Sequence, residues 1–256
     1  MNKMRSIALA CLMCAILLTG CSSSVDADTN TVYIDKNGKV TSVDIETLDQ
    51  SYYDETELKA FVDEAVEAYN EENGSGAVKV EELTVSGDTA TLKVQYKTAA
   101  DYTGFNGIEM YQGKVIQALA DGYDFDASFV KVENGVVTGS VSREEIYAQD
   151  EIKVVIIRAK NIDVKVEGEI LYVSSEDVEL VGNDTISIKK GSWLGDKPTV
   201  ESVPATEAVE AENTEAEEVM AEVVDSTEVY AEISIEEEVV DDGSFETDVY
   251  TYIIYK

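Results

Sequence analysis

Residues 54–74 read DETELKAFVDEAVEAYNEENG, and this stretch decides the fold class. Asp54 is placed to cap the N-terminus of a helix, Glu57 to complete a capping box, and Gly74 to end the helix. Between them, apolar side chains recur at helical spacing, at Leu58, Phe61, Val62, Ala65, Val66 and Tyr69. Because one apolar stripe must be covered by another layer, we expect this helix to pack on a sheet in an α+β fold.

Strand-like stretches flank the helix on both sides. Before it, residues 31–35 and 40–48 alternate apolar and polar side chains around Asn37-Gly38, a dipeptide that supplies the positive φ angles of a tight hairpin turn. After it, residues 78–85 and 89–97 form a second alternating pair. We therefore expect two β-hairpins, one on each side of the helix.

The second half of the chain is predicted to be almost all β. A third hairpin is centred on Asn134-Gly135, and residues 152–159 form a β-branched run typical of a buried central strand. Residues 98–106 suit a short helix or a loop, and residues 108–119 fit either a strand or a helical turn. Shorter strand-like stretches lie at residues 162–166, 170–174, 178–181 and 185–189. The sequence thus predicts a mostly antiparallel sheet in a domain of residues 31–198.

The chain changes character after this domain. Residues 199–246 contain many acids and no Lys or Arg, so self-repulsion predicts a disordered, low-complexity acidic segment. Residues 247–256 include Tyr252-Ile253-Ile254-Tyr255, whose aromatic and β-branched content is strand-like. We expect this last strand to pair back into the sheet, which makes the acidic segment an inserted loop.

The first 20 residues are typical of a secretory signal peptide. Lys3 and Arg5 precede an apolar run, residues 6–18, that is shorter than the ~20 residues a membrane-spanning helix needs. Leu18-Thr19-Gly20-Cys21 then resembles the lipobox of bacterial lipoproteins. The resemblance implies cleavage before Cys21, acylation of the Cys21 sulfur, and a lipidated tether over residues 21–30. The alternatives are an ordinary secretory signal with a chance cysteine, or an uncleaved anchor.

The resemblance extends beyond this motif. The order of lipobox, Asn-Gly hairpin, Tyr52-Tyr53-Asp54 and terminal strand is similar to that of uncharacterised lipoproteins of low-GC Gram-positive bacteria. It implies a palmitate-type anchor at the extracytoplasmic face of the cell membrane, because two acyl chains hold a protein stably. It implies no known activity.

The amino-acid composition limits the chemistry of the exported domain. Cys11 and Cys14 leave with the signal peptide and Cys21 would be acylated, so the domain keeps no thiol. Histidine, the usual general base and transition-metal ligand, is absent from the sequence. We therefore assign no catalytic or metal-binding residue and expect no cofactor. The sequence favours a non-catalytic binding or envelope-support module, and a carboxylate-based glycan hydrolase is the alternative.

The formal net charge of −34 restricts the partners. Nucleic acid is disfavoured, because binding a polyphosphate needs clustered Lys and Arg. A basic protein or a glycan remains a candidate partner. Divalent cations are another, held weakly by the many carboxylates of the acidic segment, residues 199–246. The alternative for this segment is a solvated spacer that keeps the domain soluble and away from an anionic surface.

Two local features are candidates for ligand contact. Trp193, the only tryptophan, lies between Gly191 and Gly195, where it is either displayed for stacking on a ligand or packed as a loop anchor at a sheet edge. Because tryptophan usually buries most of its area, the anchor is favoured. Three acids, Asp121, Asp124 and Asp126, are close in sequence, which fits either a weak cation site or a solvated loop, with the loop favoured.

Overall fold

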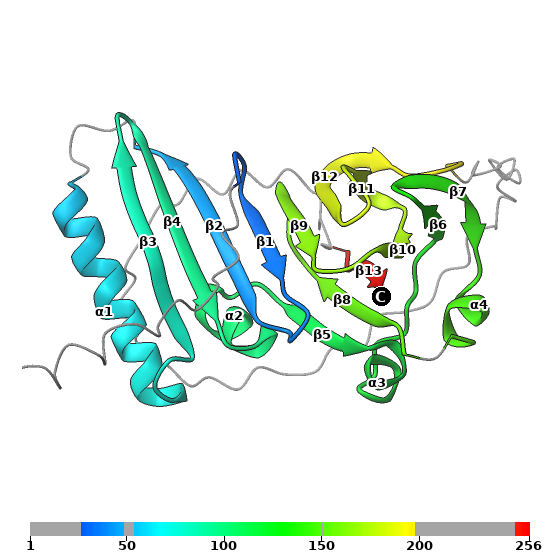
Figure 1. The fold of residues 1–256 in the computed structure, drawn as a ribbon, viewed down its shortest axis with the longest axis horizontal. Coiled ribbons are helices and arrows are strands. Elements are labelled where there is room, and N and C mark those ends of the chain that lie inside the picture. Colours follow the sequence, from blue (N-terminus) through cyan, green and yellow to red (C-terminus); the bar gives the residue numbers. More distant parts are fainter. Residues whose placement is uncertain (1–26, 49–53, 150, 198–248) are drawn as a thin grey trace, which may run out of the picture. The chain divides into compact units, whose positions relative to one another are not determined.

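The structure is a computed structural model and describes residues 27–48, 54–149, 151–197 and 249–256 (Figure 1). The signal peptide, the lipobox with Cys21, the start of the tether and the acidic segment 199–246 lie outside the described residues. By its contacts the chain divides into a unit of residues 1–197 and 248–256 and a unit of residues 198–247. Every described residue belongs to the first unit.

The described residues form helices and strands in an α+β arrangement, as expected. The helices are α1 (Glu55–Asn73), α2 (Ala99–Asn106), α3 (Val115–Ala120) and α4 (Arg143–Tyr147). The first strands are β1 (Thr31–Ile34), β2 (Val40–Thr47), β3 (Val78–Ser86), β4 (Thr89–Tyr96), β5 (Met110–Lys114), β6 (Phe129–Glu133) and β7 (Val136–Val141). The later strands are β8 (Lys153–Ile157), β9 (Ile162–Val166), β10 (Ile170–Ser174), β11 (Glu176–Leu180), β12 (Thr185–Trp193) and β13 (Thr251–Tyr255).

These strands make two sheets, where the sequence led us to expect one. Their orders are β11-β12-β9-β1-β2-β4-β3 and β5-β8-β13-β10-β6-β7. Every pair is antiparallel except β1 with β9, so the mostly antiparallel prediction is confirmed. The difference arises at Glu167-Gly168, which does not close a hairpin but carries the chain from β9 in one sheet to β10 in the other.

Two hydrophobic cores lie on the two faces of the six-stranded sheet. The first core contains side chains from both sheets, including Val32 and Ile253, and partly buried residues of α1 and α2 pack against it. The second core lies on the other face of the six-stranded sheet and includes Val115 of α3, Ile146 of α4 and Phe125. The six-stranded sheet is therefore covered on both faces.

The return of the C-terminal strand is confirmed. β13 pairs with β8 on one side and β10 on the other, and all five of its residues are buried. Ile253 and Tyr255 belong to the first core, whereas Tyr252 and Ile254 belong to the second. β8, from the run predicted to be a central buried strand, alternates between the two cores in the same way.

The main helix begins and ends where predicted but is less buried than its apolar stripe suggests. The Glu57 N–H donates to Asp54 Oδ1 at 3.0 Å, and at the other end of the helix the Gly74 N–H donates to the Asn70 carbonyl at 3.0 Å. α1 lies alongside β3 at the edge of its sheet (Figure 1). Val62 is the one residue of α1 that is buried, and Phe61 is 71% exposed. An edge strand is too narrow to cover the whole stripe, which is why Phe61 faces solvent.

The hairpin turns and short helices show where local patterns hold. The turn at Asn134-Gly135 has positive φ at both residues, as predicted, whereas at Asn37-Gly38 only Gly38 does. That first turn is longer, because Asp35 accepts hydrogen bonds within it. Residues 98–106 form α2 behind Thr98 as N-cap, and residues 108–119 form both β5 and α3. Helix α4 was not predicted, and it interrupts the otherwise β-rich second half.

Candidate functional site

Two adjoining cavities lie beside the first residues of β13. The larger has a volume of about 580 Å³ and is lined by Tyr111, Asp121, Gly122, Tyr123, Asp124, Tyr250 and Tyr252. The smaller, of about 280 Å³, shares Asp124, Tyr250 and Tyr252 with it and is otherwise lined by Asp126, Ala127, Ser128, Ser174, Glu176, Trp193 and Val249. Together we call them the tyrosine–aspartate groove. Cavities of this size suit a small ligand or one side chain of a larger partner.

The register of three neighbouring strands brings the tyrosines of the groove together. Tyr111 of β5 and Tyr252 of β13 are both paired with Ile156 of β8, so their side chains lie on the same face of the sheet. Tyr250 is two residues before Tyr252 and shares that face. Tyr123 follows α3, where its N–H donates to the carbonyl of Ala118 at 3.0 Å.

The tyrosine rings contact one another along the groove. Centroid distances are 4.9 Å from Tyr111 to Tyr123, 6.0 Å from Tyr123 to Tyr250 and 6.5 Å from Tyr250 to Tyr252. The last two pairs meet edge to face, at 83° and 65° between planes. Such pairs favour this arrangement because the positive edge of one ring meets the negative face of the next. The rings therefore form a wall whose members support one another.

The loop of residues 121–127 supports this wall. Phe125 has a φ of 52°, a left-handed conformation that is costly for a bulky residue, and its side chain is fully buried. Its ring lies 4.8 Å from that of Tyr252, between centroids. On either side of it, Asp124 and Asp126 are exposed, and the Asp126 N–H donates to Asp124 Oδ1 at 3.1 Å. Burial of Phe125 thus leaves both carboxylates at the edge of the groove.

Tyr250 is fixed by residues that flank two strands of the sheet. Its hydroxyl donates to Glu109 Oε2 at 2.6 Å, and the Arg158 guanidinium lies over its ring, 4.4 Å from the centroid. Arg158 also pairs with Glu109, at 3.4 Å from Nη1 to Oε2. The hydrogen bond to Glu109, followed by burial, raises the pKa of the Tyr250 hydroxyl. Glu109 precedes β5 and Arg158 follows β8, so Tyr250 is tied to both strands.

The charged side chains that line the groove are all acidic. They are Asp121, Asp124, Asp126 and Glu176. Burial raises the pKa of Tyr111 to about 12, with a hydrogen bond to Asp121 and its charge adding to the effect. Burial also raises the pKa of Tyr252 to about 12, with the charge of Asp124 as the next cause. Neighbouring carboxylates oppose a further negative charge, and these shifts reflect that.

Trp193 lies at the end of β12, in the wall of the smaller cavity. It is paired with Glu176 of the edge strand β11 and is partly buried. Its indole Nε1–H is buried and has no hydrogen-bond acceptor among the described residues. The Lys197 ammonium lies 5.9 Å from the ring centroid. This position at a sheet edge is the one expected for an anchor, and it also places the indole beside a cavity.

The three predicted acids are not arranged around an ion. Asp121, Asp124 and Asp126 are all exposed, and Asp126 pairs with Arg143 at 3.5 Å. In the described part of the chain, no group of three or more acidic side chains converges as a metal site would require.

The tyrosines of the groove were not predicted as site residues. The one sequence feature that points to them is the spacing of Tyr250 and Tyr252, which places both side chains on one face of an extended segment.

A third cavity differs from the groove in its charges. It has a volume of about 560 Å³ and lies near the ends of β6 and β10. Its wall contains both Lys131 and Glu133, which pair at 2.8 Å, and both Lys256 and Glu169, which pair at 3.7 Å. The remaining acid of the wall, Glu151, pairs at 2.7 Å with Lys114, which lies outside the lining. Each acid of this cavity is therefore paired with a base, unlike Asp121, Asp124 and Glu176 of the groove, for which no such pair is found among the described residues.

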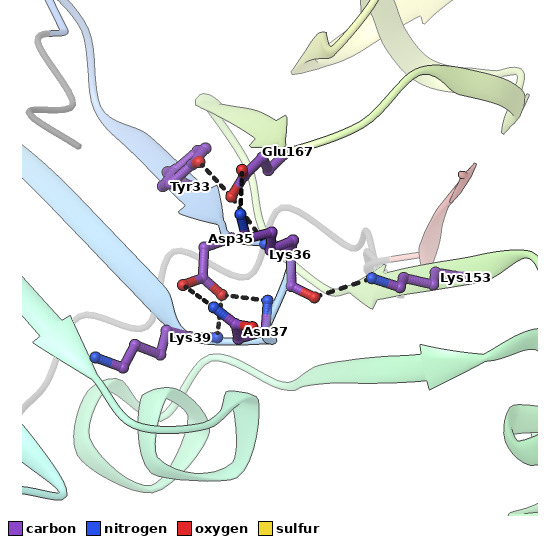
Figure 2. A network of polar contacts seen from close by, with 7 residues as sticks. All are labelled: Tyr33, Asp35, Lys36, Asn37, Lys39, Lys153 and Glu167. Atoms are coloured by element: carbon purple, nitrogen blue, oxygen red, sulfur yellow. Dashed lines mark hydrogen bonds and ion pairs between the residues drawn. The ribbon is translucent and has the colours of Figure 1, made fainter. Parts of the chain in front are cut away.

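A polar cluster at the β1–β2 turn is also a candidate, and Figure 2 shows that its side chains bond to one another and to the backbone of the turn. Asp35 Oδ1 accepts the N–H groups of Asn37 and Lys39, at 2.7 and 2.9 Å. Glu167 Oε2 accepts the Lys36 N–H at 3.0 Å and the Tyr33 hydroxyl at 3.2 Å. The Lys153 ammonium of β8 donates to the Lys36 carbonyl at 3.0 Å, which links the two sheets.

The remaining predicted site residues, Leu18, Thr19, Gly20 and Cys21, lie outside the described residues. Among the described residues, no helix is long and apolar enough to cross a membrane. No family model matches the chain, and no curated protein or solved structure matches it. The groove therefore has to be interpreted from its own geometry, as a cavity walled by tyrosines and edged by carboxylates.

Proposed function

We propose that the chain is a lipid-anchored binding module of the extracytoplasmic face of a cell membrane, with the tyrosine–aspartate groove as its ligand site. The anchor is supported by Leu18-Thr19-Gly20-Cys21 and the apolar run before it. The binding role is supported by one observation, a groove that combines tyrosine rings with exposed carboxylates. Ring faces take up stacked ligands, and carboxylates accept their hydrogen bonds.

The lining of the groove is better suited to holding a ligand than to transforming one. Its polar groups are phenols, carboxylates, one indole and the hydroxyls of Ser128 and Ser174. A nucleophilic serine would need an adjacent base, and the groove offers no imidazole or amine for that role. A carboxylate-based glycan hydrolase would use two acids across a bound sugar, such as Asp124 and Glu176. We treat hydrolysis as an outcome to be tested.

Metabolic labelling with a palmitate analogue tests the anchor. We expect the wild-type chain to carry the label and to sediment with membranes, and Cys21→Ala to lose the label. Cys14→Ala is the matched control, because it removes a thiol from the apolar run without altering Leu18-Thr19-Gly20-Cys21. An unlabelled wild-type chain, or labelling that survives Cys21→Ala, would refute acylation at this residue.

Tryptophan fluorescence tests the groove, because Trp193 is the only tryptophan and lies in its wall. The full chain in a non-ionic detergent is titrated with cationic, neutral and anionic small molecules and with soluble oligosaccharides. We expect at least one class to change the emission in the wild type, and Tyr123→Ala to weaken the response. Tyr69→Ala is the control, since Tyr69 is also a partly buried tyrosine but packs on Phe105, away from the groove.

Two results would contradict the proposal. The groove would not be a ligand site if no class of probe changed the emission, or if Tyr123→Ala and Tyr69→Ala behaved alike. The non-catalytic role would be wrong if an oligosaccharide were cleaved and the isosteric change Asp124→Asn abolished the cleavage.

A further inference from the structure

We infer that the tyrosine–aspartate groove selects an organic cation, a primary or methylated ammonium group, over neutral and anionic ligands. The inference rests on the proposed function and adds the chemical class of the ligand. It is carried by three features of the groove: the sign of its charges, the differing orientations of its tyrosine rings, and a cation that the protein already holds against one of them.

The first feature is charge. The lining of the groove contains four acids and neither Lys nor Arg. From outside the lining, Arg143 pairs with one of these acids, Asp126. Asp121, Asp124 and Glu176 are exposed, so a ligand can reach their carboxylates. An anionic ligand would be repelled by this lining. An ammonium group gains from every carboxylate near it, and most at low ionic strength.

The second feature is the arrangement of the rings. Tyr123 and Tyr250 meet at 83°, and Tyr250 and Tyr252 at 65°, so neighbouring rings turn their faces in different directions. The face of an aromatic ring is its negative side, and a cation within about 6 Å of the centroid is attracted to it. Differently oriented ring faces around one cavity are the geometry that binds methylated ammonium groups.

The third feature is an internal example of the same interaction. The Arg158 guanidinium lies 4.4 Å from the centroid of the Tyr250 ring. Its charge is shared with Glu109, at 3.4 Å, and Glu109 lies outside the lining of the cavities. Arg158 therefore shows that one ring of this cluster attracts a cation, and the ion pair of Arg158 is with Glu109, not with an aspartate of the lining.

Choline and its uncharged analogue 3,3-dimethylbutan-1-ol, titrated against the emission of Trp193, test the inference. The two molecules have nearly the same shape and differ in the charge of the central atom. At constant ionic strength, we expect choline to bind the full chain about tenfold more tightly than the alcohol. Sodium chloride at matched ionic strength controls for screening, and tetramethylammonium shows whether the hydroxyl of choline contributes.

Variants locate the binding in the groove and separate it from the acidic residues elsewhere in this chain. Asp124→Asn keeps an oxygen that can accept the Asp126 N–H and removes one charge, so we expect choline to bind about fivefold more weakly. Asp88→Asn removes one charge at the β3–β4 turn, in the other sheet, and should leave the affinity unchanged. Circular dichroism of both variants checks that the fold is retained.

The outcomes distinguish the ligand class from the proposed function. Equal affinity for choline and the alcohol, or equal effects of Asp124→Asn and Asp88→Asn, would overturn the inference. Binding of a neutral oligosaccharide or an anion, with no response to choline, would also overturn it while leaving the groove as a binding site. If no class of probe changed the Trp193 emission, both the inferred ligand class and the proposed ligand site would be refuted.

Discussion

The substitution Ile254→Ala tests whether the C-terminal strand is an integral part of the domain. β13 is separated in sequence from the rest of the domain by residues 198–247, yet it lies between β8 and β10. The Ile254 side chain is fully buried, in the core that also contains Phe125. If this arrangement holds, shortening the side chain must leave a cavity between the sheet and the layer formed by α3, α4 and Phe125.

The size of the effect follows from the atoms removed. Isoleucine loses its buried methyl and methylene groups on truncation to alanine, each with a transfer free energy of about 0.8 kcal/mol. The residual cavity adds to this loss, and buried Ile→Ala changes cost about 2 to 5 kcal/mol in total. Because β13 is covered on both faces and has little room to collapse, we expect about 3 to 4 kcal/mol. In a domain of this size that lowers the melting temperature by roughly 10 °C.

Thermal unfolding of the full chain in a non-ionic detergent, followed by near-ultraviolet circular dichroism, measures the loss. Ile253→Ala should cost a similar amount, because Ile253 is equally buried in the other core. Val136→Ala, on the edge strand β7, changes a side chain that is 62% exposed and should cost under about 0.5 kcal/mol. The placement of β13 would be refuted if Ile254→Ala were as mild as Val136→Ala.

Further predictions concern one glycine and two kinds of titrating group. Gly168→Ala should destabilise the fold by about 1 to 3 kcal/mol, because a Cβ there would lie 2.9 Å from the Tyr255 ring and against the Lys256 carbonyl. Gly182→Ala is the control. Its Cβ would have a carboxylate oxygen of Asp184 as nearest neighbour, at 3.7 Å, so it should cost little in the same thermal unfolding experiments. Burial raises the pKa of Asp44 above the ordinary aspartate value of 3.8, so the fold loses stability as pH rises from 3.8 through the raised pKa. Asp44→Asn can still accept the hydrogen bond from Ser42. It should therefore raise the melting temperature near pH 7 and leave it unchanged near pH 3. The raised pKa of about 12 for Tyr111 and Tyr252 means that stability is lost as pH rises from about 10 to 12, and Tyr111→Phe and Tyr252→Phe should each reduce the phenolate absorbance that appears near pH 12.

The local patterns of the sequence predict most of the elements, because each depends on neighbouring residues alone. The caps at Asp54 and Gly74 bound α1, and positive φ at Asn134-Gly135 closes the predicted hairpin. The division into two sheets could not be predicted this way. It depends on Glu167-Gly168, which reads like a turn but carries the chain to the second sheet. The exposure of Phe61 has the same kind of cause, since the width of the edge under α1 is a tertiary property.

The candidate site was predicted only in part. Asp121, Asp124, Asp126 and Trp193 stand out in the sequence, and the structure places three of them, Asp124, Asp126 and Trp193, around one cavity. The tyrosines did not stand out, because they come from segments that are far apart in the chain. Tyr111 and Tyr252 become neighbours only through the register of β5 and β13 on β8, which no local pattern specifies.

The place of these tyrosines in the last strand has a physical reason. β13 is buried on both faces, and a buried phenol needs a hydrogen-bond partner for its hydroxyl. The middle of such a strand offers few partners, and there the sequence has Ile253 and Ile254. Tyrosines are placed toward the two ends, where Tyr255 receives a hydrogen bond from Gln112 at 3.4 Å and Tyr250 donates to Glu109 at 2.6 Å. A strand that is buried on both faces thus has its aromatic rings and their hydrogen-bond partners near its ends. At the N-terminal end of β13, the aspartates of residues 121–127 lie beside these rings, and together they line the groove.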